Sequence, residues 1–196
     1  MPHIPPYTKG LMLACVALSC VAWLVPGLFG VLALWPLASG HFLPWQVLSY
    51  AFLHGDVFHL FFNMFGLWMF GSEIEQLWGQ KRYARFLLAS VLTAALVQLG
   101  FIALMGTFYP TVGISGGLFG LLLAFGMMFP NRIIMPLFPP IPMKAKVFVA
   151  VFGVLELFLG VGGRDGIAHF AHLGGMLGGW LMIRFWRGQA PFGRRR

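Results

Sequence analysis

The chain has 196 residues, of which 59% are hydrophobic and only 9% are charged. Soluble domains carry about 25% charged residues, so this composition excludes a disordered chain, a nucleic-acid-binding domain and most soluble enzymes. The mean hydropathy of +0.84 favours a polytopic membrane protein. With about 20 residues for each membrane-spanning helix, the chain holds roughly six or seven such helices. We therefore expect a single membrane domain over residues 1–196 and no soluble domain beside it.

Apolar segments predict an all-α fold, a bundle of six membrane-spanning helices. The region 28–57 is also apolar, but it is interrupted by Pro36, Gly40 and Pro44. Because prolines and glycines break regular elements, we expect an irregular first loop that lies in or on the bilayer. The six expected spans cover residues 11–25, 58–78, 82–105, 115–129, 145–161 and 167–186.

Basic residues are distributed unevenly between the expected loops. Arg164 alone falls on one side of the membrane, and the other twelve of the thirteen Lys and Arg residues fall on the opposite side. Cytoplasmic loops are enriched in Lys and Arg, so we expect both chain termini to be cytoplasmic. The net charge of +8 is then a sign of topology and not of affinity for nucleic acid. The twelve residues are Lys9, Lys81, Arg82, Arg85, Arg132, Lys144, Lys146, Arg184, Arg187 and residues 194–196.

Strongly polar side chains inside the expected spans are candidate functional groups, because keeping them in a bilayer is costly. With a helical rise of about 1.5 Å per residue, four of these side chains fall at a similar depth in the outer half of the membrane. The full set is His59, Asn63, Glu73, Glu75, Ser115, Glu156, His169 and His172. The four at similar depth are His59, Asn63, Ser115 and His172.

The position of Ser115 suits a nucleophile. It starts the fourth span directly after Gly113-Ile114, and the free N–H groups at a helix N-terminus attract an anion. A nucleophilic serine needs a general base in contact with its Oγ, and His172 at the same depth could serve. His59 and Asn63 are four residues apart and therefore share a helix face, from which both could donate hydrogen bonds to an oxyanion.

Small residues offer a way for the fourth and sixth spans to approach each other. Gly116/Gly120 and Gly174/Gly178 both have small-xxx-small spacing, and so does Gly175/Gly179. We expect Gly116/Gly120 to meet Gly174/Gly178, with the two backbones nearly in contact. This packing would bring the imidazole of the sixth span to the serine of the fourth.

Three motifs together resemble the rhomboid intramembrane serine proteases. They are Gly-x-Ser-Gly at Ser115, His-x-x-x-Asn at His59 and Asn63, and Ala-His-x-Gly-Gly at His172. The resemblance covers essentially the whole chain. It implies that Ser115 is the nucleophile and His172 the base of a two-residue dyad, and that His59 and Asn63 stabilise the oxyanion. It also implies no cofactor, no metal, and substrates that are transmembrane proteins.

Two further features bear on this resemblance. Gly71-x-x-x-Glu75-x-x-x-Gly79 is similar to a family motif whose glutamate has a structural role beneath the site. Where the family often has Trp-Arg in the first loop, this chain has Trp45-Gln46, and where it often has a tyrosine near the histidine, this chain has Phe119. Phe119 can stack on the imidazole but offers no hydroxyl.

Several polar residues remain outside this scheme. Glu156 lies in the middle of the fifth span without an evident partner, and either a structural hydrogen bond to the second span or a gating role is open. We expect Glu73 and Glu75 to pair with Arg82 or Arg85 near the inner surface. Other expectations are that Asp165 is a solvated loop carboxylate, not a third catalytic member, and that His54 serves the first loop.

The expected function is intramembrane endopeptidase activity toward transmembrane segments, in a prokaryotic cytoplasmic membrane. One alternative is a catalytically inactive rhomboid-like protein that binds transmembrane segments. Another is a haem or zinc protein that uses His54, His59, His169 and His172, but a His-Glu-x-x-His motif is missing from the sequence.

Overall fold

The computed structural model describes residues 3–106, 108–137, 140–162 and 167–189. Within them the fold is all-α apart from one short hairpin, in which β1 (Ile133–Ile134) pairs antiparallel with β2 (Met143–Lys144). The long helices are α1 (Pro6–Leu24), α6 (Gln80–Met105), α7 (Ser115–Met128), α8 (Ala145–Gly162) and α9 (His169–Trp186). A further helical run consists of α4 (Val57–Gly66), the π-helical segment η3 (Leu67–Gly71) and α5 (Ser72–Trp78).

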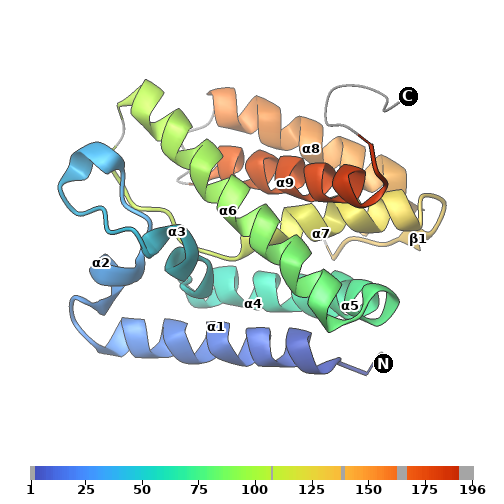
Figure 1. Ribbon diagram of the computed structural model, residues 1–196, viewed down its shortest axis with the longest axis horizontal. Coiled ribbons are helices and arrows are strands. Elements are labelled where there is room, and N and C mark those ends of the chain that lie inside the picture. Colours follow the sequence, from blue (N-terminus) through green and yellow to red (C-terminus); the bar gives the residue numbers. More distant parts are fainter. Residues whose placement is uncertain (1–2, 107, 138–139, 163–166, 190–196) are drawn as a thin grey trace.

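The first loop contains only short helices, as its prolines and glycines predict. They are α2 (Leu28–Leu32), η1 (Leu37–Ser39), α3 (Gln46–Ser49) and η2 (Tyr50–Phe52). With the α4–α5 run counted as one helix, successive long helices run in opposite directions along the molecule, so that α1 begins and α9 ends at the same end, while α2 and α3 lie at the other end (Figure 1).

Each of the six apolar ranges contains a helix, but length and hydropathy identify only some of them as spans. Among the described residues, α1 and α6 are long and apolar enough to cross a membrane. Helix α7 is apolar but has only 14 residues. The all-α class is confirmed, whereas the six-span topology stays a prediction. The first helix begins at Pro6, five residues before the expected start, which is possible because proline is tolerated in the first helical turn.

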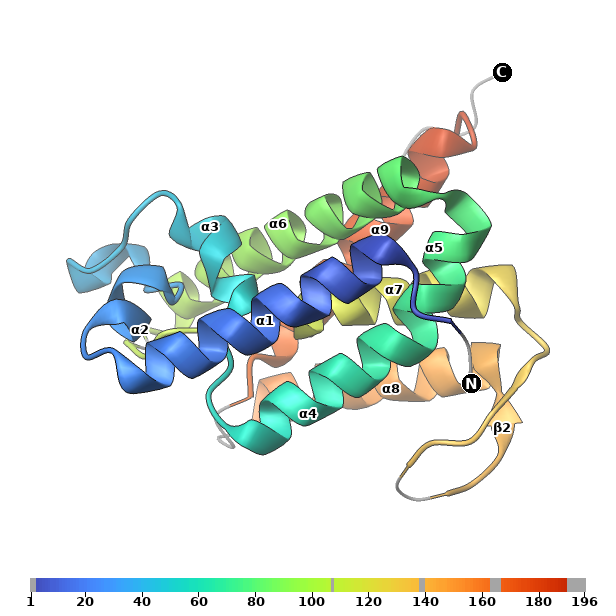
Figure 2. The same cartoon turned by 90° about the horizontal axis from the view of Figure 1, so that it is seen from below.

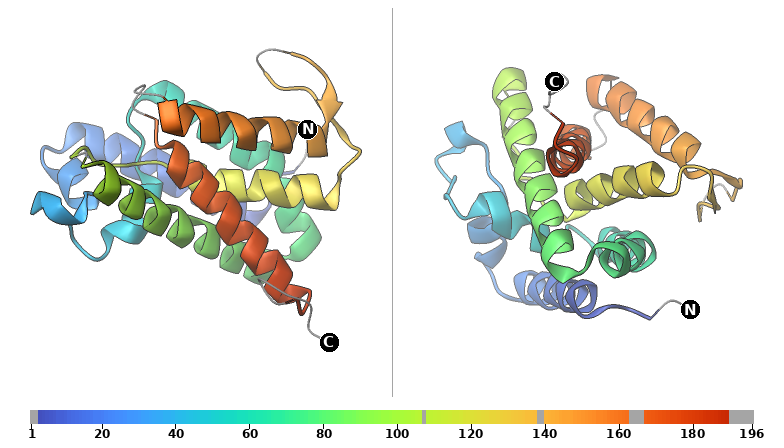
Figure 3. Two further views of the ribbon diagram at one scale, coloured as in Figure 1. Left: turned by 90° about the horizontal axis from the view of Figure 1, so that it is seen from above. Right: turned by 45° about the vertical axis from the view of Figure 1, so that its right-hand side comes forward.

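Helix α9 packs against α6, α7 and α8 (Figure 3). A Cβ atom at Gly175 would overlap the carbonyl oxygen of Gly116, and a Cβ at Gly120 would lie 2.9 Å from the Gly175 oxygen. Gly174 and Gly178 face α6 instead. The expectation that Gly116/Gly120 meet Gly174/Gly178 is therefore wrong by one position on α9, which is about 100° around a helix.

Helix α5 lies beside the start of α1 (Figure 2). Glu75 on α5 connects the two helices. Its carboxylate accepts hydrogen bonds from the Tyr7 N–H at 3.0 Å, the Thr8 N–H at 2.6 Å and the Thr8 hydroxyl at 2.7 Å. The first N–H groups of a helix have no acceptor of their own, and a carboxylate there is favourable. The expected pairing with Arg82 or Arg85 is wrong for Glu75, and it is also wrong for Glu73, which pairs with Arg132.

Gln46 anchors the first loop from a fully buried position. Its Oε1 accepts from the N–H groups of Trp35 at 3.2 Å and Leu43 at 3.1 Å. Its Nε2 lies 3.1 to 3.4 Å from three backbone carbonyl oxygens, among them that of Val31. The neutral amide of Gln46 thus connects three parts of the loop. The proteins that this chain resembles often carry an arginine at this position. Trp45 adds a hydrogen bond from its indole N–H to the Val31 carbonyl, at 3.0 Å.

Candidate active site

The first loop holds the segment that leads into Ser115. Leu34 and Thr111 exchange two backbone hydrogen bonds, of 3.0 and 2.9 Å, in an isolated antiparallel bridge. Two residues later the Gly113 N–H donates to the Tyr50 carbonyl at 2.9 Å. Helix α7 then begins at Ser115. The irregular loop therefore fixes the position of this serine through backbone contacts.

Gly113 is a position that requires glycine for two reasons. Its φ of +115° is in the region that other residues rarely adopt. In addition, a Cβ atom there would lie 2.7 Å from Nε2 of His59. The absence of a side chain lets the imidazole of α4 lie directly against the backbone beside Ser115.

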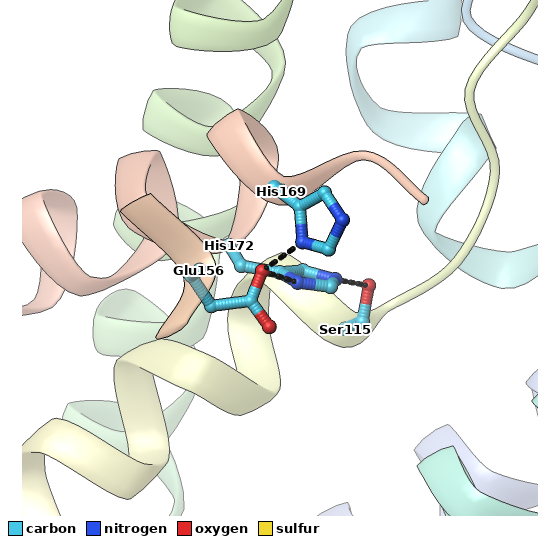
Figure 4. Close-up of polar contacts among 4 residues, drawn as sticks. All are labelled: Ser115, Glu156, His169 and His172. Atoms are coloured by element: carbon cyan, nitrogen blue, oxygen red, sulfur yellow. Dashed lines mark hydrogen bonds and ion pairs between the residues drawn. The ribbon is translucent and has the colours of Figure 1, made fainter. Parts of the chain in front are cut away.

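Ser115 and His172 come together as the sequence predicts. The Ser115 Oγ lies 2.8 Å from Nε2 of His172, across the contact between α7 and α9 (Figure 4). The ring of Phe119 stacks on the imidazole, with 4.3 Å between ring centroids and 7° between the planes. The ring that follows one turn after the serine thus holds the histidine flat against α7.

Glu156 is the residue whose surroundings the sequence does not reveal. From α8 its Oε2 lies 2.8 Å from Nδ1 of His172 and 2.7 Å from Nδ1 of His169 (Figure 4). All three residues are buried, with relative exposures of 9% or less. The cost of a carboxylate in an apolar helix is the one signal that it needed a partner. Of the two alternatives left open for Glu156, a hydrogen bond to the second span is not what these contacts show, because both go to α9.

His59 and Asn63 lie on the same cavity as the serine and histidine. This cavity has a volume of about 600 Å³, and all four side chains line it. The Nδ2 of the buried Asn63 donates to the His59 carbonyl at 2.9 Å, which leaves its second hydrogen available. Oδ1 of Asn63 has no partner among the described residues. The remaining walls are largely apolar; they include Phe58, Phe62, Tyr109, Leu118 and Phe119.

The four histidines considered above as haem or zinc ligands do not gather at one metal site in the part of the chain that the structure describes. Among the described residues, one group offers three possible metal ligands within 4.8 Å of one another, and it consists of Glu156, His169 and His172. Nitrogen and carboxylate oxygen atoms of this kind can bind zinc, but here they are joined by hydrogen bonds. Asp165, considered above as a loop carboxylate, and its neighbour Arg164 lie outside the described residues.

His54 belongs to the first loop, as expected. It is fully buried, and its Nδ1 lies 3.0 Å from the hydroxyl of Ser19 on α1. Its ring meets that of His59 edge to face, with 5.0 Å between centroids. Burial, together with the neighbouring His59, lowers the pKa of His54 to about 4. The ring is therefore neutral at pH 7 and joins the loop to α1 without adding charge to the cavity.

Comparison with known proteins identifies relatives that match most of this chain. A family model for the rhomboid domain matches residues 41–188. The chain is 28% identical to the mitochondrial Rhomboid protein 1 of Saccharomyces cerevisiae, over 91% of this chain and 56% of that protein. It is 29% identical to the rhomboid protease GlpG of Yersinia pestis, over 92% of this chain and 62% of that protein. It is 28% identical to the rhomboid protease GluP of Bacillus subtilis, over 70% of this chain and 25% of that protein. The chain therefore spans only part of the length of these relatives.

Proposed function

Because the chain belongs to the rhomboid family, we propose that it is an intramembrane serine endopeptidase that cuts transmembrane segments of membrane proteins. The observation that carries the proposal is the 2.8 Å contact between Ser115 Oγ and His172 Nε2. Both atoms belong to residues that line the cavity of about 600 Å³. Two of the relatives bear the name rhomboid protease, which supports the same reaction.

The proposed reaction begins with proton transfer from the Ser115 hydroxyl to Nε2 of His172. The Oγ atom forms a bond to the carbonyl carbon of the scissile peptide, and the carbonyl oxygen becomes an oxyanion. The imidazolium then gives its proton to the leaving amine nitrogen, and the C–N bond breaks to leave an acyl-enzyme. A water molecule then gives a proton to His172 and forms a bond to the acyl carbon. The imidazolium returns this proton to Oγ as the ester C–Oγ bond breaks, which releases the carboxylic acid and restores Ser115.

We propose three donors for the oxyanion. The N–H of Ser115 lies in the first turn of α7, where backbone N–H groups have no acceptor within the helix. His59 lies against Gly113, and Asn63 follows one turn later on α4. Both side chains face the cavity, from which they could donate to the charge that develops on the substrate.

The proposed setting is a bilayer crossed by six helices with both termini in the cytoplasm. The alternating course of the helices supports this topology, because α1 begins and α9 ends at one end of the molecule (Figure 1). The residues that line the cavity lie in or next to the first turns of α4, α7 and α9. A substrate helix would have to unwind there, since a helix hides its peptide carbonyls. We propose a prokaryotic cytoplasmic membrane, although the relatives include mitochondrial as well as bacterial proteins.

The decisive experiment compares the wild-type protein with Ser115→Ala in liposomes that contain a model transmembrane substrate. We expect the wild type to make a single cut and Ser115→Ala to make none, because removal of a nucleophile costs many orders of magnitude in rate. A fluorophosphonate should label Ser115, and His172→Ala should suppress this labelling. Substrate that binds but stays intact with the wild type would favour the inactive, segment-binding alternative.

A further inference from the structure

One carboxylate oxygen of Glu156 contacts the imidazole nitrogens of two histidines. The distances from Oε2 are 2.8 Å to Nδ1 of His172 and 2.7 Å to Nδ1 of His169 (Figure 4). An ionised carboxylate only accepts hydrogen bonds, so each imidazole must present an N–H at Nδ1. With Glu156 ionised, the two contacts therefore require the proton of each neutral ring to be on Nδ1.

This protonation has a direct consequence at the serine. A neutral imidazole carries one proton, so His172 with its proton on Nδ1 has a free lone pair on Nε2. That lone pair faces the Ser115 Oγ at 2.8 Å, and the hydroxyl donates to it. The form of His172 that Glu156 selects is the form that can act as a base toward the serine.

We propose that Glu156 is a positioning residue for the reaction, and that the working unit is a Ser115–His172–Glu156 triad and not a dyad. This inference rests on the protease function proposed above. Glu156 holds the His172 ring through Nδ1, and it stabilises the imidazolium that forms when His172 takes the serine proton. No proton passes to the carboxylate.

The surroundings of Glu156 favour this role over a general packing role. The side chain sits on α8, while both of its partners sit on α9, so the contacts fix the depth of α8 relative to the histidine. His169 lies one turn before His172 and acts as a second donor, which keeps Oε2 pointed at the ring that contacts Ser115. In a buried setting, where the effective dielectric constant is lower, an opposite charge at this distance has a larger effect than in water.

The test uses the full chain in liposomes with the variants Glu156→Gln, Glu156→Asp and Ser115→Ala. Glutamine keeps the size and an acceptor oxygen but removes the charge. The corresponding amide replacement in soluble serine proteases costs about 10⁴-fold in kcat, and we expect a loss here of about 10²-fold or more, with KM nearly unchanged. Aspartate retains the charge and should recover part of the rate. Glu73→Gln removes a carboxylate that pairs with Arg132 instead, and it should turn over substrate as the wild type does.

A spectroscopic measurement on the wild type avoids any problem with folding of the variants. In protein labelled with ¹⁵N at histidine, the His172 signals, assigned by their loss in His172→Ala, should show a protonated Nδ1 and an unprotonated Nε2. A protonated Nε2 in the neutral ring would overturn the inference.

The outcomes separate this inference from the protease proposal. If Ser115→Ala is inactive while Glu156→Gln keeps the wild-type kcat, the dyad alone suffices and the triad is wrong. If the activity of Glu156→Gln falls only in proportion to the amount of folded protein, the role is structural and the triad is again wrong. If Ser115→Ala cleaves like the wild type, the proposed function itself fails.

Discussion

The backbones of Gly116 on α7 and Gly175 on α9 touch so closely that no side chain fits at position 175. Ser115 directly precedes Gly116, and His172 lies one turn before Gly175. The distance between the two helix backbones therefore sets the distance between the serine hydroxyl and the imidazole.

We predict that Gly175→Ala loses activity more severely than it loses folded protein. The added methyl group would push α7 and α9 apart, and a misplacement of about 1 Å can cost on the order of 10² in rate. Overpacking of this kind typically costs about 1–3 kcal/mol in stability. Turnover and thermal stability should be measured together.

Gly100→Ala on α6 is the matched control, because nothing lies within 4 Å of a Cβ atom there. Equal turnover by Gly175→Ala and Gly100→Ala would show that this contact does not set the geometry.

A second prediction concerns the oxyanion. Loss of one donor costs about 10²–10³ in rate in a soluble serine protease. We expect Asn63→Ala and His59→Ala each to lower kcat substantially, and to a smaller extent if the donors share the task. Phe61→Leu provides a control on α4, since this exposed ring is not among the residues that line the cavity. If neither polar deletion changed turnover, the pair would be reassigned to helix packing.

The sequence predicted the meeting of Ser115 and His172 well, because it contains the information that this meeting needs. Apolar runs locate the helices, the helical rise gives the depth of each polar residue, and glycine spacing indicates close packing. The sequence does not determine the rotation of α9 about its axis, because Gly174/Gly178 and Gly175/Gly179 have identical spacing and only three-dimensional packing distinguishes them.

The partners of Glu156 and Glu75 could not be found from the sequence for different reasons. Glu156 meets α9 because α8 and α9 pack side by side, and no spacing within α8 encodes the rotation that aims it there. Glu75 binds two backbone N–H groups, which every residue except proline possesses and which no motif marks. Charge pairing with a nearby arginine was the simpler expectation, but the unsatisfied start of α1 determines the contact.

A third prediction concerns metals. The proposed reaction uses only the serine, imidazole and carboxylate groups of the chain, so EDTA or phenanthroline should leave the rate of substrate cleavage unchanged. The test is informative because one group of side chains could hold an ion: the ligand atoms of Glu156, His169 and His172 are close enough together to bind one. Activity that a chelator abolished and that zinc restored would contradict the proposed mechanism and support a metal-dependent one.

The last prediction concerns pH and His54. Burial lowers the pKa of this ring to about 4 in the folded protein, from an ordinary value of 6.5. The unfolded chain therefore takes up a proton near pH 6.5, whereas the folded protein resists it until about pH 4. Stability from His54 is complete above pH 6.5 and is lost as the pH falls, by about 1.4 kcal/mol for each pH unit within this window.

His54→Asn places an amide where Nδ1 contacts Ser19 and cannot titrate, so its apparent Tm should fall less between pH 6.5 and 5. His41→Asn, at an exposed position of the same loop, should follow the wild type. Parallel Tm curves for His54→Asn and the wild type would show that protonation of His54 does not limit the stability of the first loop.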